Sequence, residues 1–395
     1  MSKKLHAIIA GAGVGGLTAA VALARAGLRV TLLERASVLG EVGAGLQLAP
    51  NATSCLARLG LLDRVSVFAS APEQLRIRRG RDGKELTRVP LGPIADFRWG
   101  APWFVIHRAD LQRALLEACA AESDITLHTG LAVTGFALSS NGVEVGARNG
   151  DDIERIEGDL LIGADGLRSL VRERIGLGMG DAPVWSGRTA WRAVVPAKLA
   201  PPEALRLETN LWLGPRTHLV HYPVRMGELV NVVAIAEDGW RAEGVDDLWS
   251  VAAEPAEISP SFNTWCDEAR GLVIAARQWL RWPLFDRNPV RRWRNERVAL
   301  LGDAAHPMLP FFAQGAAQAI EDAAALGDAF HAHGGNINAA LAAYEDTRAS
   351  RAGAVVIASR RQGAVYHMRG PMGLARDFVM RRLGPERMMN RLDWL

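Results

Sequence analysis

The chain has 395 residues, which is enough for two or three domains with cores of their own. Its 46 basic and 43 acidic residues leave a net charge of +3, which argues against nucleic acid or an anionic membrane as a partner. Three widely spaced cysteines argue against a disulfide framework and a zinc site, and no apolar stretch reaches the ~18 residues of a spanning helix. We therefore expect a cytoplasmic protein with no membrane span and no bound metal.

The N-terminal segment has the pattern of a βαβ unit. Residues 5–10 form an apolar run that is typical of a buried parallel strand, and a glycine-rich turn follows. The small residues of 16–27 predict a helix that ends at Gly27, and residues 29–34 predict a second strand.

Two helices are predicted beyond this unit. They cover residues 51–65 and 107–121, and we expect Asn51 to cap the first and one of residues 108–110 to cap the second.

The middle of the chain is richer in strands. Residues 125–147 predict strands with a hairpin turn at Asn141-Gly142, and 159–166 predict a buried strand that ends in a tight turn. From about 181 to 285, where most of the twelve tryptophans lie, alternating segments predict a second, sheet-rich domain with an aromatic interior.

Residues 297–307 return to the strand-then-turn pattern, and long helices follow from residue 315. The first domain is therefore expected to be interrupted by the second. The expected division is 1–70, 101–180 and 286–365 for the first domain, 71–100 and 181–285 for the second, and 366–395 for a C-terminal helical tail.

The glycine-rich turn, GAGVGG at residues 11–16, matches the dinucleotide-binding fingerprint. Gly11 permits the tight turn, Gly13 lets a pyrophosphate approach the backbone, and Gly16 allows close packing of helix on strand. Glu34 ends the second strand, where a carboxylate can accept hydrogen bonds from an adenosine ribose. Together these features predict a dinucleotide site, and a merely tight turn between strand and helix is the alternative.

Two further strands end in a turn that contains an aspartate. GADG at 163–166 is one, although a lone Asp-Gly is usually a turn whose aspartate bonds its own backbone. GDAAHP at 302–307 is the other, and its Asp303 could reach a ribityl hydroxyl. The glycine-centred helix start within 313–323 offers backbone N–H groups to an anionic ring oxygen.

In this order and spacing the motifs resemble those of the FAD-dependent aromatic hydroxylases with the para-hydroxybenzoate hydroxylase fold (group A flavin monooxygenases). The chain is most similar to the branch of salicylate hydroxylase, 3-hydroxybenzoate 6-hydroxylase and 6-hydroxynicotinate 3-monooxygenase. The resemblance rests on GAGLQLAPNA (43–52), HRADLQ (107–112), GADGLRS (163–169) and GDAAHPMLPFFAQGAAQAIEDA (302–323). Gln318 stands where the branch often has methionine, and Phe311-Phe312 where it often has aliphatic residues.

The resemblance implies an α/β FAD-binding domain of Rossmann-like βαβ type, with an inserted sheet-rich substrate domain and C-terminal helices. Arg108 would lie near the phosphate and ribityl part of FAD, and the backbone of 315–317 would face the pyrimidine edge of the flavin. Asp165 would serve both FAD and the nicotinamide cofactor. The residues implied to bind the cofactor are Gly11, Gly13, Val14, Gly15, Gly16, Glu34, Arg35, Arg108, Asp165, Asp303, Pro310, Gly315, Ala316 and Ala317.

The implied reaction hydroxylates a small hydroxylated aromatic or heteroaromatic acid of the hydroxybenzoate, salicylate or hydroxynicotinate type. NADH or NADPH reduces FAD transiently, O2 adds at the flavin C4a to give a hydroperoxide, and its distal oxygen attacks an electron-rich ring carbon. The protein must exclude water and draw a proton from the ring hydroxyl, a task that suits histidine. The alternatives are a larger or non-carboxylated phenol as substrate, and a flavin-binding redox sensor without turnover. The resemblance also suggests a homodimer.

THLVHYP, residues 217–223, has the alternation of a strand, so His218 and Tyr222 share one face and His221 lies on the other. Residues three apart on a strand face opposite sides, which disfavours a metal pair of the two histidines. A histidine in a sheet is more often a core residue than a catalytic one. In the hydroxylase branch, however, a histidine and a tyrosine four apart on this strand contact the substrate.

His218 and Tyr222 match those two positions. We expect His218 to hydrogen-bond or deprotonate the ring hydroxyl and Tyr222 to hold a polar substituent, with His221 structural. Gln314 matches a further catalytic and substrate-contacting position, and Gln47 and Phe312 are additional candidates for binding the substrate.

Overall fold

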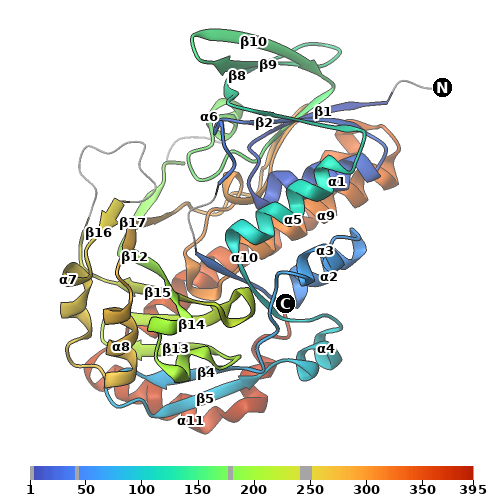
Figure 1. The fold of residues 1–395 in the computed structure, drawn as a ribbon. Coiled ribbons are helices and arrows are strands. Elements are labelled where there is room, and N and C mark those ends of the chain that lie inside the picture. The colour runs from blue at the N-terminus through green and yellow to red at the C-terminus, as the bar shows by residue number, and fades with distance from the viewer. Residues whose placement is uncertain (1–3, 41–43, 177–180, 241–250, 395) are drawn as a thin grey trace.

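The structure is a computed structural model, which describes residues 4–40, 44–176, 181–240 and 251–394. Two large sheets organise the molecule, one near each end of the view in Figure 1. The first sheet has six strands: β18 (Arg294–Asn295), β19 (Val298–Leu300), β11 (Leu160–Gly163), β1 (His6–Ala10), β2 (Arg29–Glu34) and β7 (Ile125–Thr129). Its central strands are parallel, and β18 is an antiparallel edge.

The six-stranded sheet is buried between two layers. All five residues of β1 are buried, as expected for a parallel strand that is covered on both faces. The covering helices are α1 (Val14–Arg25), α5 (Arg108–Ala120), α9 (Gly315–His333) and α10 (Ile337–Tyr366), which pack together through α1 and α9. The opposite face carries a small antiparallel sheet of β8 (Ala132–Leu138), β9 (Val143–Asn149) and β10 (Asp152–Gly158).

The second sheet has eight strands and contains the stretch with two histidines. In spatial order its strands are β16 (Val251–Ala253), β17 (Trp279–Asp286), β12 (Val184–Pro196), β15 (Leu229–Ala236), β14 (Thr217–Val224), β13 (Thr209–Gly214), β4 (Gln74–Arg79) and β5 (Glu85–Pro90). One face packs on α7 (Pro255–Ile258) and α8 (Asp267–Ala275) through a core that includes Trp191, Trp212, Trp265 and Trp279. The predicted aromatic interior is thus confirmed.

The other face of this sheet looks toward the half of the molecule that contains the first sheet. It packs against the end of α10 and against α11 (Gly370–Asn390), which also lies along β5. Figure 1 shows α10 running between the two sheets and α11 along the edge of the second one. The two sheets draw their strands from the ranges assigned above to the two domains, and the boundaries themselves stay a prediction.

The remaining elements connect these layers. They are β3 (Gly45–Leu48), β6 (Phe104–His107), α2 (Pro50–Arg58), α3 (Leu62–Ser66), α4 (Pro93–Trp99), α6 (Leu170–Ile175) and the short 3-10 helices η1 (Ala197–Leu199), η2 (Pro202–Leu205), η3 (Arg225–Gly227), η4 (Ser259–Phe262), η5 (Gly302–Ala304) and η6 (Pro310–Phe312).

Both predicted helix caps are wrong. The helix expected over 51–65 is split into α2 and α3 at Gly60, whose φ is +57°, and the N-cap of α2 is Ala49 because Pro50 occupies the first helical position. The N-cap of α5 is His107, not one of residues 108–110. The side chain of Asn51 is instead buried and bonds groups on α9.

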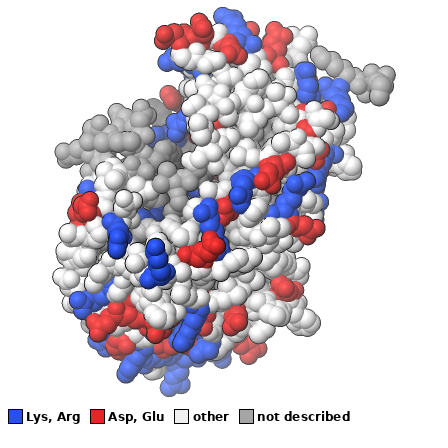
Figure 2. Space-filling model, viewed as in Figure 1, with Lys and Arg blue, Asp and Glu red and all other residues white. Residues whose placement is uncertain are grey.

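The surface carries mixed charge on the face seen in Figure 2, where basic and acidic side chains lie interspersed. None of the helices in the described part of the chain is both long and apolar enough to span a bilayer.

Candidate active site

The glycine-rich turn joins β1 to α1 with very little room. Gly11 has φ +101° and its N–H donates to the carbonyl of Leu33 at 2.7 Å, which fixes the turn against β2. A Cβ on Gly16 would lie 1.9 Å from the carbonyl oxygen of Gly11, so only glycine fits there. A Cβ on Gly13 would meet no atom within 4 Å. The space beside Gly13 is therefore open, as a group that approaches this backbone requires.

Glu34 lies beside the same turn. One of its carboxylate oxygens accepts the N–H of Ala12 at 2.8 Å, and the other accepts the N–H of Ala36 at 2.9 Å. The carboxylate is thus held at the end of β2 next to the open side of the turn, where carboxylate oxygens have further acceptor capacity. Val14 is buried in α1, and Arg35 is exposed.

Asp303 and Arg108 lie close enough for their charges to interact. Asp303 is exposed to solvent, yet the surrounding protein raises the pKa of its carboxyl, and the charges of His306 and Arg108 act against that rise. Gly315 lies beside this carboxylate, since a Cβ there would be 4.0 Å from Asp303 Oδ1.

Helix α9 begins beside Asp303 without a cap. Its N-cap residue, Gln314, makes no capping bond, and no acidic residue lies in its first turn. The N–H groups of Gly315, Ala316 and Ala317 and the positive end of the helix dipole are therefore available to an anionic group. Pro310 is half-buried in η6, just before this helix. The turn, the charged pair of Asp303 and Arg108, and this helix start fit the parts of FAD that the sequence assigns to them.

Asp165 takes part in the turn that leads into α6. Its carboxylate accepts the hydroxyl of Ser169 and the N–H of Val171, the latter at 3.1 Å, and so stabilises the start of α6. Burial raises the pKa of this carboxyl, and these hydrogen bonds lower it. Its service to FAD and to a nicotinamide cofactor stays a prediction.

Strand β14 divides its two histidines between the faces of the second sheet. His221 stacks on Trp212 of the core under α8, with ring centroids 6.0 Å apart and an angle of 27°. His218 lies on the opposite face, toward η6 and the end of α10. The parity predicted from THLVHYP is confirmed, and one ion could not bind both rings.

His218 is enclosed by aromatic rings. The centroids of Phe311 and Tyr366 both lie 5.4 Å from its ring, and that of His367 lies 5.1 Å away. Burial, helped by His367 and Arg188, lowers the pKa of His218 well below 6.5. The imidazole is therefore neutral at physiological pH and has a lone pair that can accept a proton.

Tyr222 occupies the same face, four residues along β14, where burial raises the pKa of its hydroxyl. It packs against Gly45 of β3 so closely that a Cβ on Gly45 would lie 2.6 Å from Cε2 of the tyrosine ring. Strand β3 also carries Gln47, which is half-buried. The strand is held there by a hydrogen bond of 2.6 Å from the N–H of Gly45 to Oδ1 of Asn231.

Arg192 of β12 shares this face, although sequence reasoning missed it. Arg192 is paired across the sheet with Val233 of β15, which is paired with Val220 of β14. Val220 lies between His218 and Tyr222 on the same face of β14, so Arg192 is level with the gap between those two side chains. Its guanidinium lies 4.4 Å from the ring centroid of Trp282, and its charge counteracts the raised pKa of Tyr222. The face therefore offers a base, a phenol and a cation. An arginine within the apolar run TAWRAVV was the signal for this group in the sequence.

Gln314 and Phe312 point elsewhere than expected for residues that contact substrate. The Gln314 side chain is buried and accepts a hydrogen bond from Asn51 at 2.9 Å. Phe312 lies against Trp394, with ring centroids 5.9 Å apart, and the ring that reaches His218 is that of Phe311. The substrate roles of Gln314, Phe312 and Gln47 stay predictions.

Gln318, the residue that departs from the branch, belongs to a polar network below the start of α9. Its amide donates to Glu321 at 2.8 Å and its carbonyl accepts from Arg348 at 2.7 Å. Arg348 also bonds Asp322 at 2.7 Å, and Asp322 accepts from the N–H of Gly302 at 2.9 Å. A glutamine is suited to this position because both of its polar atoms have partners.

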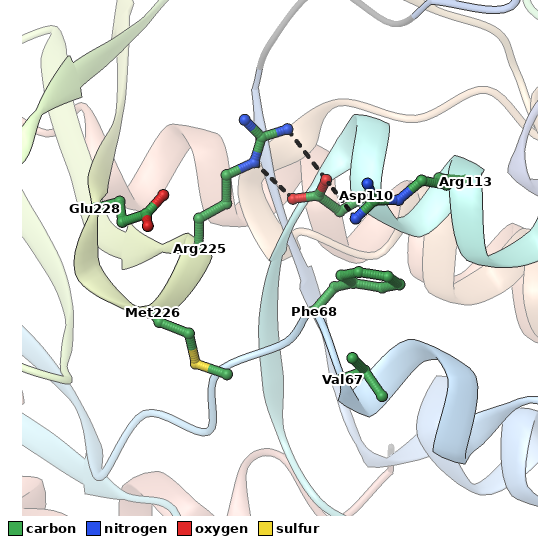
Figure 3. A pocket seen from close by; sticks show the side chains of 7 residues that line it. All are labelled: Val67, Phe68, Asp110, Arg113, Arg225, Met226 and Glu228. Atoms are coloured by element: carbon green, nitrogen blue, oxygen red, sulfur yellow. Dashed lines mark hydrogen bonds and ion pairs between the residues drawn. The ribbon is translucent and has the colours of Figure 1, made fainter.

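A separate cavity of about 360 Å³ lies at the far end of β14. Figure 3 shows Arg225, just beyond the strand, reaching across to Asp110 on α5, with hydrogen bonds of 2.8 and 3.1 Å. Arg113 lies over the ring of Phe68 at 4.1 Å on the other side. This cavity is lined by none of the predicted cofactor- or substrate-binding residues, and its ion pair links the end of β14 to the helix that begins at Arg108.

Comparison with known proteins identifies the class. Residues 4–359 match the family model described as FAD binding domain, so the chain belongs to this family. The expected class, an FAD-dependent monooxygenase of the aromatic hydroxylase type, and its fold of an FAD-binding domain with an inserted sheet domain are confirmed.

Individual relatives cover nearly the whole chain. A 3-hydroxybenzoate 6-hydroxylase of Polaromonas naphthalenivorans is 36% identical over 392 residues, which cover 99% of this chain and 95% of that protein. A 6-hydroxynicotinate 3-monooxygenase of Bordetella bronchiseptica is 35% identical over 369 residues, with 90% of each chain covered. The structure of Klebsiella pneumoniae HpxO with FAD and uric acid matches with a TM-score of 0.85 and 29% identity, and covers 98% of this chain and 96% of that one.

Proposed function

We propose that this flavoprotein uses NADH or NADPH and O2 to hydroxylate a small aromatic or heteroaromatic acid that carries a ring hydroxyl. The single observation that supports this most is the set of groups on one face of the second sheet. Neutral, buried His218 lies on that face with Tyr222 and with the cation Arg192 in the row between them. A base together with a cation matches a ring that bears both a hydroxyl and a carboxylate.

FAD would supply the oxygen chemistry, since it takes a hydride from the nicotinamide and delivers one oxygen atom to the ring. The glycine turn with Glu34, the side chains of Asp303 and Arg108, and the start of α9 would hold it. The protein contributes orientation, the exclusion of water and one proton transfer. These tasks fall to the residues of the sheet face.

His218 would accept the proton of the ring hydroxyl at Nε2, because its Nδ1 is occupied by His367 at 2.8 Å. Removal of that proton raises the electron density of the ring and makes it a better nucleophile toward an electrophilic oxygen. Phe311 and Tyr366, which flank the imidazole, would keep bulk water from the reacting atoms. Tyr222 would hold a polar substituent of the ring, and Arg192 would bind the carboxylate.

The test is turnover of the purified, FAD-loaded protein. NADH and NADPH oxidation is followed with 3-hydroxybenzoate, salicylate and 6-hydroxynicotinate, and the products are analysed by mass spectrometry alongside a hydrogen peroxide assay. We expect at least one acid to stimulate oxidation and to gain one oxygen atom. Stimulation only by larger or non-carboxylated phenols would support the alternative substrate class. No stimulation by any phenol would favour a redox sensor without turnover.

The homodimer also stays a prediction, and light scattering on the FAD-loaded protein tests it.

A further inference from the structure

The imidazole of His218 is the inner end of a hydrogen-bonded chain. Its Nδ1 lies 2.8 Å from Nε2 of His367, and Nδ1 of His367 lies 3.1 Å from a carboxylate oxygen of Glu237. His218 and His367 are only 2% and 5% exposed, whereas the side chain of Glu237 is 32% exposed. The chain therefore runs from the buried face of the sheet to solvent, through residues of β14, the end of α10 and the end of β15.

The carboxylate at the outer end orders the protons along this chain. Arg188 Nε lies 3.3 Å from Nδ1 of His367, but it also donates to Glu237 at 3.2 Å. A carboxylate only accepts hydrogen bonds, so the shorter contact of 3.1 Å between Nδ1 of His367 and Glu237 favours hydrogen on that nitrogen. Nε2 of a neutral His367 is then an acceptor, which requires Nδ1 of His218 to carry hydrogen toward it. Nε2 of His218 is consequently left with its lone pair. That is the tautomer that a base for a substrate hydroxyl needs.

We propose that His367 and Glu237 form a relay that carries the proton taken by His218 from the substrate to solvent. This inference rests on the proposed hydroxylation. It assigns roles to two residues that lie 149 and 19 positions beyond His218 in the sequence, both outside the motifs on which the family resemblance rests.

The transfer balances as four proton steps without any change in electrons. The O–H bond of the ring hydroxyl breaks and an N–H bond forms at Nε2 of His218, which leaves a phenolate. The Nδ1 proton of His218 then moves to Nε2 of His367, and the Nδ1 proton of His367 moves to Glu237 and on to water. Reverse flow returns a proton to the product oxygen and restores both tautomers.

The groups around His367 favour passage of the proton over its retention. Burial lowers the pKa of His367 to about 4, with Glu237 acting against this and with Arg188 and Arg376 contributing to it. Arg188 on β12 also donates to Glu237 at 2.9 Å. Tyr366 precedes His367 at the end of α10, and its backbone carbonyl accepts a hydrogen bond from Arg376 of α11 at 2.6 Å. Two cations thus oppose a lasting imidazolium here, while the carboxylate gives the proton an exit.

The first test measures the tautomers and needs no substrate. Nitrogen NMR of the FAD-loaded protein with 15N-labelled histidine should show His218 and His367 neutral and protonated at Nδ1, assigned with His218→Gln and His367→Gln. Glu237→Gln should shift the tautomer balance of His367, because an amide can also donate. Protonation of His218 at Nε2 in the free enzyme would overturn the relay. This result holds whether or not any acid is turned over.

The second test measures proton release. The FAD-loaded protein is mixed, in a weakly buffered solution of phenol red, with whichever of 3-hydroxybenzoate, salicylate and 6-hydroxynicotinate stimulates NAD(P)H oxidation. In His367→Gln and Glu237→Gln we expect release to slow about tenfold or more while the Kd of the acid changes less than about threefold. Glutamine keeps hydrogen bonds at position 367 but cannot pass a proton on.

Two controls separate the relay from a structural role. His221→Gln changes the buried histidine on the other face of β14 and should release the proton at the wild-type rate. In His367→Gly, added imidazole should restore fast release. Wild-type release in His367→Gln and Glu237→Gln would overturn the relay, whereas the absence of any stimulating acid would contradict the proposed function and leave the tautomer result as the test of the relay.

Discussion

The backbone of Gly16 packs directly on the carbonyl of Gly11, at a distance that would put a Cβ only 1.9 Å from the carbonyl oxygen. Gly13, between them, has extended backbone and open space where its Cβ would be. The two glycines of one motif therefore serve different purposes. Gly16 is required by the protein fold, and Gly13 is required by whatever occupies the space beside it.

Alanine substitutions should separate these two purposes. We expect Gly13→Ala to leave the Tm of the FAD-free protein unchanged and to weaken FAD binding, because the methyl group enters the space that the pyrophosphate needs. Gly16→Ala should lower the Tm of the FAD-free protein itself, since the backbone must shift. Thermal unfolding and FAD titration measure the two effects. Equal loss of Tm in both variants would contradict this division.

Replacement of His218 should damage chemistry more than cofactor binding. We expect His218→Ala to lower the rate of hydroxylation about a hundredfold or more, in line with the loss of a general base. FAD absorbance and FAD affinity should be retained. His221→Leu is the matched control, because that imidazole lies on the opposite face against Trp212, and its turnover should stay near wild type. If the two variants lose activity alike, the face assignment does not explain catalysis.

Much of this site was visible in the sequence because it depends on local patterns. The glycine spacing, the strand before it and Glu34 lie within one βαβ unit, and strand alternation suffices to place His218 and Tyr222 on one face. His367 and Arg192 were not predicted. Their places depend on which strands pair and on where α10 ends, and neither is encoded in a short window.

The wrong helix cap at Asn51 has the same origin. Its side chain was expected to serve the local backbone, and it instead bonds Gln314 of α9 at 2.9 Å. The local sequence favoured a helix cap. The Asn51 amide instead bonds buried polar groups of α9, because leaving such groups without hydrogen-bond partners would cost more free energy than the loss of a cap.

Buried histidines should make the fold sensitive to mild acid. Burial lowers the pKa of His221 to about 3 and of His367 to about 4, and it lowers the pKa of His218 below 6.5 as well. Below about pH 6.5 the unfolded chain therefore binds protons that the folded chain excludes, so stability falls with falling pH at about 1.4 kcal/mol per pH unit for each such histidine.

Urea unfolding of the FAD-free protein at about pH 7.5, 6.5 and 5.5 measures this slope. His221→Leu removes one titrating group. Between pH 6.5 and 5.5 the free energy of unfolding of this variant should therefore fall less steeply than that of the wild type, by the contribution of about one bound proton. The carboxylates with lowered pKa values, such as Asp322 at about 2, titrate outside this range. An unchanged slope in His221→Leu would mean that this imidazole is protonated in the folded state.

Arg192 should discriminate acids from neutral phenols. We expect Arg192→Met to weaken binding of 3-hydroxybenzoate by about 1.5–3 kcal/mol, or about ten- to hundredfold in Kd, which is the usual contribution of a hydrogen bond to a charged group. Binding of 3-hydroxybenzamide, which has no carboxylate, should change little. Titration of the FAD-loaded protein with both ligands measures the difference. A similar loss for both would assign Arg192 to packing on Trp282.

Arg348 should be critical for the stability of the region around the first turns of α9. It bonds Asp322 at 2.7 Å and also pairs with Glu321, and its side chain is 3% exposed. Burial alone would raise the pKa of Asp322, but His306 and Arg348 overcome this and lower it to about 2. Removal of the arginine would leave two buried carboxylates without the cation that bridges them.

We expect Arg348→Met to cost about 3–5 kcal/mol in the free energy of unfolding, as measured by urea titration of the FAD-free protein. Arg351→Met is the matched control, because Arg351 bonds the same Glu321 at 2.7 Å but its side chain is 35% exposed. A pair so accessible to water should contribute about 1 kcal/mol or less. The contrast should extend to cofactor binding, because Asp322 accepts the N–H of Gly302, the residue before Asp303. Equal destabilisation by the two substitutions would show that burial of the arginine does not set the strength of this network.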